Sequence, residues 1–378
     1  LKFTQRRETM KAYSELSKDE LMELHETLKA AYEEKKSLGL SLDMSRGKPS
    51  PTQLNVSLPL MDVLDSAADL KSEGGLDCRN YGGLDGIPEA KKLMADMMGT
   101  TPEHINIPMN EDGPDMDLVE KLVSGDEAVK GIWCVPKYSN PAGVCYSDET
   151  VKRFAALKPK AKDFRIFWDN AYVIHHLYED RQVQILDIIS ECEKAGNPDM
   201  VFEFASTSKV SFPGSGISAL AASEANLADA KKTFTIQTIG HDKLNQLRHV
   251  RYFKNIDGLM AHMMKHAAQM RPKFEASLDV LDQELTGLGI GTWTRPLGGY
   301  FISFDAMEGC AAKIVAKCKE AGMVLTGAGA TYPYHKDPTD SNIRIAPSFP
   351  SAEEMKQATD LFVLCVKLVS VEKLLETR

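Results

Sequence analysis

Short apolar runs alternate with helical patterns in the middle of the sequence, and this alternation constrains the fold more than any other feature. The runs are "GIWCVP" (131–136), "FRIFWDNAY" (164–172) and "DMVFEFAST" (199–207), each bounded by Pro, Asn or Gly. Between them, "SDETVKRFAALK" and "VQILDIISECEKAG" have helical periodicity. Strands that alternate with helices predict a parallel sheet with crossover helices.

The two ends of the chain follow a different pattern. A helical segment near the start opens with a capping box, Ser17 with Glu20, and the last helical segment opens with another, Ser351 with Glu354. Helix dominates from about residue 224, and three strand-like runs follow it: "GGYFISFD", "GMVLTGAGA" and "NIRIAP". We therefore expect an α/β fold with a mostly parallel central sheet, helices on both of its faces, and a smaller α+β domain formed by both chain ends. The expected division is 1–50 for the N-terminal part of the small domain, 51–250 for the large domain and 251–378 for the C-terminal small domain.

Composition excludes several classes of partner. The net charge is −9 and no basic cluster is present, which argues against nucleic acid or an anionic membrane as a partner. No apolar run approaches the roughly 18 residues of a membrane span. The first residues lack the apolar stretch of a secretion signal, and the 7 cysteines are scattered without a CxxC pair. These observations favour a cytoplasmic protein with reduced thiols.

Polar side chains follow each of the three predicted strands. They are Asn140 after the first, Asp169 and Tyr172 after the second, and Ser206, Ser208 and Lys209 after the third. Each has a structural explanation when taken singly: Asn140 precedes a proline in a turn, Asp169 could cap a helix, and Lys209 could be solvated. Ligands bind at the carboxyl ends of strands in open parallel sheets, so the joint occurrence points to a single crevice.

One chemical requirement unites these residues. Pyridoxal phosphate is held by a lysine Schiff base, with a carboxylate against its pyridinium nitrogen. The carboxylate favours the protonated nitrogen, so that the ring acts as an electron sink. Hydroxyls and backbone N–H groups hold the phosphate. One Lys, one Asp, an Asn, a Tyr and a Ser/Gly loop match that set of needs.

Four motifs carry a resemblance to a known family. "SNPAG", "WDNAY" and "STSK", followed far downstream by "NIRIAP", resemble the fold-type I pyridoxal-phosphate aminotransferases of class I/II. Within them the chain is most similar to a bacterial aspartate-aminotransferase-like (type Ic) subgroup. The resemblance extends from "SRGKPSP" through "NYGGLDG" and "PLGGYF" to Arg344. It implies a ping-pong transfer of an amino group between an amino acid, with aspartate favoured, and a 2-oxo acid such as 2-oxoglutarate.

The resemblance also implies roles for the cofactor-side residues. Lys209 would form the Schiff base and then move a proton between the substrate Cα and the cofactor C4′ carbon. Asp169 would pair with the pyridine nitrogen. Tyr172 and Asn140 would hydrogen-bond the phenolic oxygen, with Asn140 also beside the substrate. The phosphate would be held by the hydroxyls of Ser206 and Ser208 and by the backbone at Gly214 and Gly216.

Three further residues are implied on the substrate side and at a subunit interface. Arg344 would clamp the substrate α-carboxylate through its bidentate fork. Gly47 resembles a glycine at which the backbone approaches the substrate. Tyr81 matches a tyrosine that reaches the phosphate of the neighbouring subunit, which implies a homodimer with shared active sites.

The chain departs from the family pattern in two places. The family often places an arginine shortly after the lysine, but here Ile217 stands eight positions after Lys209, so backbone N–H groups and serines would replace that charge. Relatives also put roughly twice as many residues between the positions of Tyr81 and Asn140, and the join falls near Ile105. Either the segment is deleted, or the 378-residue sequence omits it. We favour omission, because a deletion would remove part of the sheet core.

Other interpretations compete with the aminotransferase one. "GSGISA" (214–219) fits a dinucleotide-binding pattern only weakly, because no acidic residue follows at a second strand end. His262 and His266 stand at i, i+4, but a solvated helix face is favoured over a metal pair, and no metal site is predicted. His175 and His176 are interpreted as local packing. The remaining functional alternatives are a β-eliminating lyase on the same fold and a non-catalytic effector-sensing domain.

Overall fold

The computed structural model describes residues 12–45, 50–64, 67–73, 78, 87, 89–90, 109–332 and 337–376. The chain divides into two compact units. The terminal unit comprises residues 1–50, 270–296 and 300–378, and the central unit comprises residues 51–269 and 297–299. The second division falls inside helix α9 (Ile256–Leu285), later than the boundary we expected at residue 250. A continuous helix contains no turn signal, so the sequence gives no sign of a division at that place.

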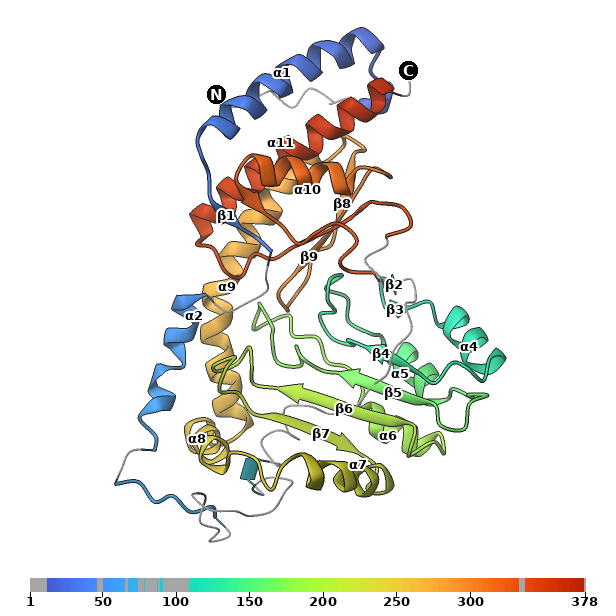
Figure 1. The fold of residues 1–378 in the computed structure, drawn as a ribbon, viewed down its shortest axis with the longest axis vertical. Coiled ribbons are helices and arrows are strands. Elements are labelled where there is room, and N and C mark those ends of the chain that lie inside the picture. The colour runs from blue at the N-terminus through green and yellow to red at the C-terminus, as the bar shows by residue number, and fades with distance from the viewer. Residues whose placement is uncertain are drawn as a thin grey trace. The chain divides into compact units, whose positions relative to one another are not determined.

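A four-stranded sheet forms the middle of the central unit (Figure 1). Its strands, in spatial order, are β4 (Gly131–Cys134), β5 (Arg165–Asp169), β6 (Val201–Ser206) and β7 (Ser218–Ala222). Strands β4, β5 and β6 are mutually parallel, which confirms the predicted α/β architecture, whereas β7 returns antiparallel to β6. The parallel register places Asp169, at the end of β5, opposite Phe204 of β6.

Helices and short strands complete the central unit. They are α2 (Pro51–Val56), η2 (Leu58–Met61), β2 (Met109–Asn110), β3 (Gly113–Pro114), α4 (Met116–Gly125), α5 (Asp148–Ala155), α6 (Ile188–Lys194), α7 (Glu224–Gln237), α8 (Lys243–Phe253) and the first half of α9. Side chains at the N-termini of α4, α5, α6, α7 and α8 accept hydrogen bonds from first-turn N–H groups, so these helices start at well-defined residues.

The two faces of the sheet differ in burial. Alternate residues such as Ile166 and Trp168 are buried in one core with α4, α5 and α6. On the opposite face Trp133, 40% exposed, stacks on Phe167 at 6.2 Å between ring centroids, and Phe167 stacks on Phe204 at 5.8 Å. This aromatic row runs across β4, β5 and β6 and is only partly buried.

The terminal unit brings both ends of the chain together. Its elements are η1 (Tyr13–Glu15), α1 (Lys18–Ser37), β1 (Leu42–Asp43), β8 (Gly291–Trp293), β9 (Ile302–Ala306), α10 (Ala311–Glu320), β10 (Met323–Val324), β11 (Asn342–Ile345), α11 (Ala352–Glu376) and the second half of α9. Strands β11, β9 and β8 form an antiparallel sheet, and β1 pairs with β10 in parallel. Helices α1 and α11 lie side by side (Figure 1). Both predicted capping boxes are present, with Ser17 Oγ accepting from Glu20 N–H and Ser351 Oγ from Glu354 N–H, each at 3.2 Å.

Some expectations were wrong or lie outside the described residues. The run "GMVLTGAGA" gives only the two-residue strand β10, because its glycines leave little side chain to pack. Most of the helix expected at 87–99 lies outside the described residues.

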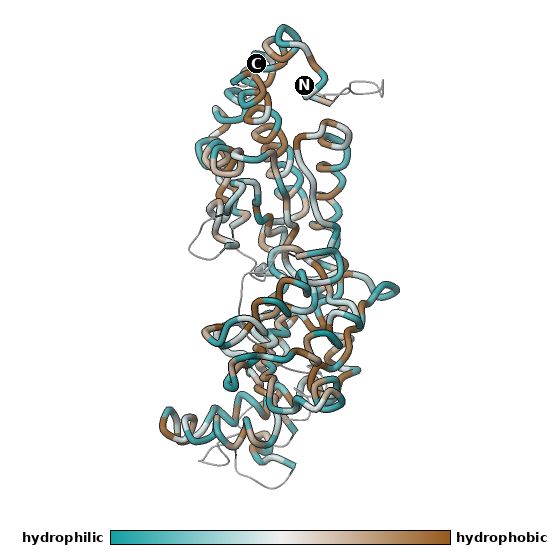
Figure 2. Tube along the Cα trace, turned by 90° about the vertical axis from the view of Figure 1, so that its right-hand side faces the viewer, coloured by the Kyte–Doolittle hydropathy of each residue, from teal (hydrophilic) through white to brown (hydrophobic). Residues whose placement is uncertain are grey.

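No helix among the described residues is long and apolar enough to cross a membrane, and hydrophilic stretches are interspersed along the tube in Figure 2. All seven cysteines are free thiols.

Candidate active site

The parallel pairing of β5 and β6 brings Asp169 and Lys209 to the same edge of the sheet. Asp169 is the last residue of β5, and Lys209 lies in the turn that follows β6. Each charge influences the pKa of the other, so the two groups are close enough to interact. This is the edge at which the sequence predicts a crevice.

Lys209 is half-buried, and its amine has a lowered pKa. Burial lowers the pKa of its amine, and the nearby Asp169 carboxylate opposes that shift without reversing it. Its Nζ lies 5.2 Å from the centroid of the Tyr172 ring, which is buried beneath it. A lysine with a lowered pKa is neutral in a larger fraction of molecules at neutral pH, and the neutral amine is the nucleophile.

Asp169 is held by its own set of donors. Burial raises the pKa of its carboxyl, while Lys209, a hydrogen bond from the Trp133 indole and the Ala171 backbone N–H act in the opposite direction. A cation brought against this carboxyl would add to those three influences and favour the ionised form. The sequence interpretation did not include Trp133 in the site; its position at a strand end next to "CVPKYSN" was the available signal.

The loop after β6 combines two hydroxyls with a tightly packed glycine. Ser206 Oγ and Ser208 Oγ lie 2.6 Å apart, and the Ser208 N–H donates to Ser206 Oγ at 3.1 Å. A Cβ added at Gly216 would lie 3.1 Å from the Ser208 nitrogen, so glycine permits a close approach there. A Cβ added at Gly214 would meet nothing within 4 Å, so packing does not require glycine at that position.

The remaining predicted residues fall in different parts of the chain. Asn140 is exposed in the turn after β4 and joins Pro141 through a cis peptide bond. Arg344, on β11 of the terminal unit, donates to Thr326 Oγ1 at 3.1 Å and to the Ser45 carbonyl at 3.5 Å, and its guanidinium lies 4.4 Å from the Phe301 ring centroid. Gly47 and Tyr81 lie outside the described residues.

The expectation for two histidines was wrong. His262 and His266 are 3% and 2% exposed, so they do not form a solvated helix face. Their helix, α9, is packed on this side against the turn that follows β6, where His262 Nε2 lies 2.9 Å from the Val210 carbonyl oxygen. An i, i+4 pair of histidines does not by itself reveal such a tertiary contact. No group of three metal-ligating side chains occurs within the described ranges.

The dinucleotide pattern in "GSGISA" has the wrong structural context. Gly216 leads into strand β7, and a helix begins only at α7, after Ser223. The fingerprint needs a helix N-terminus directly after the glycines to face the pyrophosphate. The glycines instead belong to the loop that carries Lys209.

Comparison with known proteins defines the class. The family model described as aspartate amino-transferase matches residues 16–107 and 103–378, and the chain belongs to this family. It is therefore an aminotransferase, and structures with the same fold are pyridoxal-phosphate aminotransferases of fold type I.

Individual relatives agree with this assignment. The chain is 39% identical to an aspartate aminotransferase of Corynebacterium glutamicum, covering 92% of this chain and 94% of that one. The crystal structure of an aspartate transaminase from C. glutamicum superimposes with a TM-score of 0.92 at 37% identity, covering 97% of this chain and 100% of that one. LysN, the α-aminoadipate aminotransferase of Thermus thermophilus, was solved as a complex with N-(5'-phosphopyridoxyl)-L-leucine. It shares the fold with a TM-score of 0.69 at 17% identity, and the match covers 88% of this chain and 93% of that one.

The comparisons also locate a shortened stretch. The two family matches meet at residues 103–107, where the sequence places the join near Ile105. The alignment with the C. glutamicum sequence spans 412 positions, whereas 92% of 378 residues is about 348. About 60 positions of that relative therefore have no counterpart in this sequence.

Proposed function

We propose that this aminotransferase uses pyridoxal phosphate, bound covalently through Lys209, to move an amino group between aspartate and a 2-oxo acid such as 2-oxoglutarate. The observation that supports the cofactor assignment best is the half-buried Lys209 amine, which interacts electrostatically with the Asp169 carboxyl at the carboxyl ends of β5 and β6. The preference for aspartate rests on the relative of that name at 39% identity.

The residues present fit this cofactor. A lysine amine with a lowered pKa suits covalent attachment of the cofactor, and a half-buried carboxyl with its own donors suits a ring nitrogen that must stay protonated. The paired hydroxyls of Ser206 and Ser208, with the glycine backbone at Gly216, offer donors to an anionic group without a side-chain charge.

Each residue then has a defined task. Pyridoxal phosphate, when bound, supplies the electron sink for the charge that develops at the substrate Cα. The Lys209 Nζ accepts the Cα proton, because burial lowers the pKa of that amine and so favours its neutral form, and the Tyr172 ring beneath it limits the positions the amine can take. Arg344 binds the substrate carboxylate with its planar fork, which Thr326 and Phe301 already orient.

The covalent role of Lys209 is tested by trapping and mutation. Borohydride reduction of the protein incubated with pyridoxal phosphate, followed by peptide mapping, is expected to place the cofactor on Lys209. Lys137 is the informative competitor, because its side chain is buried and burial lowers its pKa to about 8.

Lys209→Ala is expected to lower kcat by at least about 1000-fold, whereas the exposed Lys232→Ala should retain full activity. Trapping on Lys137, or an active Lys209→Ala enzyme, would refute the proposal.

A half-reaction separates transamination from elimination. Aspartate added without any oxo acid should release one equivalent of oxo acid per active site and then stop, since a ping-pong enzyme waits for its second substrate. A β-eliminating lyase would continue to release product without an acceptor. Continued turnover in this assay would therefore favour the lyase alternative.

We also propose that the protein is a homodimer with shared active sites and that it works in the cytoplasm. The proposal of a dimer rests on the motif "NYGGLDG", which contains Tyr81 and lies outside the described residues. Sedimentation equilibrium of the purified protein tests it, because a monomer with full activity would contradict shared sites.

A further inference from the structure

Four buried histidines lie against the turn that carries Lys209 or directly behind it. They are His175, His249, His262 and His266, and we call them the histidine cage. They come from three segments of the central unit: the turn after β5, helix α8, and helix α9. A fully buried imidazole usually has a packing or hydrogen-bonding task, so four around one turn call for an explanation.

Three members of the cage contact the turn directly, and the fourth, His266, contacts His262. His175 Nε2 lies 3.4 Å from the Lys209 carbonyl oxygen, and His262 Nε2 lies 2.9 Å from that of Val210. On either side, His249 Nε2 lies 3.3 Å from Thr207 Oγ1 and 2.8 Å from Ser211 Oγ. A carbonyl only accepts hydrogen bonds, so His175 and His262 must each present a protonated Nε2 to the turn.

His175 connects the turn to a second residue of the site. Its ring meets the Tyr172 ring edge-on at 5.7 Å, and that same Tyr172 ring lies beneath the Lys209 Nζ. One side chain therefore contacts the backbone of Lys209 and the ring against which the Lys209 amine rests. Resting on the proposed role of Lys209, we propose that His175 is a positioning residue, which holds the Lys209 turn and the Tyr172 ring in their mutual arrangement by donating from Nε2.

The electrostatic state of the cage suits this task. Burial, the charge of Lys209 and the neighbouring His266 lower the pKa of His175 to about 3, so the ring stays neutral at physiological pH. A neutral imidazole donates one hydrogen bond without placing a positive charge beside an amine that must lose its own proton. His266, which lies 3.1 Å from His262 Nε2, is kept neutral in the same way, with a pKa of about 3.

The test compares two substitutions of His175 that introduce amide side chains of different length. In His175→Gln the side-chain nitrogen can occupy the place of Nε2, whereas in His175→Asn it falls near Nδ1 and cannot reach the carbonyl. The readout is the pKa of the Lys209 amine in cofactor-free protein, from the pH dependence of its acetylation by acetic anhydride. Mass spectrometry of the Lys209 peptide is normalised to the exposed Lys232. The labelling needs no cofactor, so it gives an answer even if Lys209 fails to bind pyridoxal phosphate.

We expect His175→Asn to raise the pKa of Lys209 by about one pH unit, making acetylation at pH 7 about tenfold slower, because a loosened turn gives the amine more water. His175→Gln should stay within about twofold of the wild type. His176→Asn is the matched control. His176 is buried to the same degree, but its Nδ1 lies 2.6 Å from the Tyr138 hydroxyl oxygen and not against the Lys209 turn. The proposal is overturned if His175→Asn leaves the Lys209 profile unchanged, if His175→Gln shifts it as far as Asn does, or if His176→Asn shifts it equally.

Discussion

At the scale of single residues, Glu203 is a carboxylic acid in the middle of a sheet. It lies on β6, is 0% exposed, and accepts a hydrogen bond from Asn170 Nδ2 at 2.7 Å through Oε1. Its other oxygen, Oε2, has no hydrogen-bond partner among the described residues. Burial raises the pKa of Glu203 well above its usual value, so folding favours the neutral acid at this site.

A buried neutral acid makes stability depend on pH in a defined direction. Below the ordinary carboxyl pKa of about 4, both folded and unfolded chains are protonated at this site, and it contributes no penalty. As pH rises above that value, the unfolded chain ionises while the folded one resists, so the free energy of unfolding falls until the raised folded pKa is reached.

We therefore predict that Glu203→Gln stabilises the protein at neutral pH. Gln keeps the oxygen that accepts from Asn170 and cannot ionise. The free energy of unfolding should rise by roughly 2 kcal/mol at pH 8 and change little at pH 4, as measured by urea denaturation at both values. Glu193→Gln, at an exposed position of α6, is the control. An equal gain at pH 4 and pH 8 would show that ionisation is not the cause.

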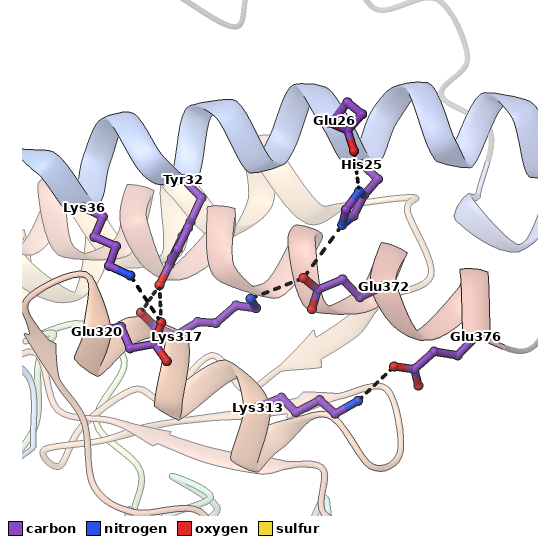
Figure 3. Close-up of polar contacts among 9 residues, drawn as sticks. All are labelled: His25, Glu26, Tyr32, Lys36, Lys313, Lys317, Glu320, Glu372 and Glu376. Atoms are coloured by element: carbon purple, nitrogen blue, oxygen red, sulfur yellow. Dashed lines mark hydrogen bonds and ion pairs between the residues drawn. The ribbon is translucent and has the colours of Figure 1, made fainter.

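At the scale of elements, helix α1 is held on α10 and α11 by one buried hydroxyl and several exposed charges (Figure 3). The buried Tyr32 donates from its hydroxyl to the Lys317 carbonyl at 3.0 Å and to Glu320 at 3.3 Å. Around it, the ion pair Lys36–Glu320 at 3.6 Å joins α1 to α10, and Lys317–Glu372 at 3.2 Å joins α10 to α11; both pairs are more exposed than Tyr32. Buried hydrogen bonds and exposed ion pairs differ in strength and in their response to salt.

Two substitutions should separate these contributions. Tyr32→Phe leaves the Lys317 carbonyl without this donor and should lower the free energy of unfolding by about 1–2 kcal/mol, at low and high salt alike. Lys36→Gln removes an exposed ion pair and should lower it by less than about 1 kcal/mol, with the effect vanishing in 1 M salt. Urea denaturation at two salt concentrations measures both. A salt-sensitive Tyr32→Phe effect would contradict this division.

The elements also show which parts of the fold the sequence could predict. Strands β4 to β6 were predictable because β-branched and aromatic residues fill them between clear turn signals. Strand β7 was missed, because "SALAA" is made of small residues with weak strand propensity. The residues at strand ends, Asp169 and Lys209, follow from the parallel topology. Contacts such as that of Trp133 with Asp169, or of His262 with Val210, depend on tertiary packing that local pattern does not encode.

At the scale of the whole molecule, the sheet has a face that suits additional chain. The half-exposed row of Trp133, Phe167 and Phe204 lies on the face opposite the core of α4, α5 and α6. The two family matches meet at residues 103–107, and about 60 positions of a relative have no counterpart here. Partly exposed aromatic side chains in a row are a surface that folded proteins usually cover.

We predict that the protein carries a further segment near Ile105 that covers this face. The intact mass of the purified protein should then exceed the 41.8 kDa of the 378-residue sequence by several kDa. Peptide mapping across residues 100–115 would locate the added residues. A mass of 41.8 kDa would mean that the segment is deleted, and the tryptophan fluorescence of Trp133 should then report a solvent-exposed ring.

The return of the chain from β6 to β7 has a consequence for folding kinetics. The Lys209 loop is closed by Ile217 N–H donating to Thr207 Oγ1 at 2.8 Å, over a separation of only ten residues. Asp169 instead meets β6 through a parallel pairing that first requires the crossover through α6. Loops of about ten residues close in roughly 10–100 ns, while long-range parallel pairings form much more slowly. We therefore expect the lysine to acquire its local geometry early in folding, and its carboxylate partner to join it only when the parallel sheet has assembled.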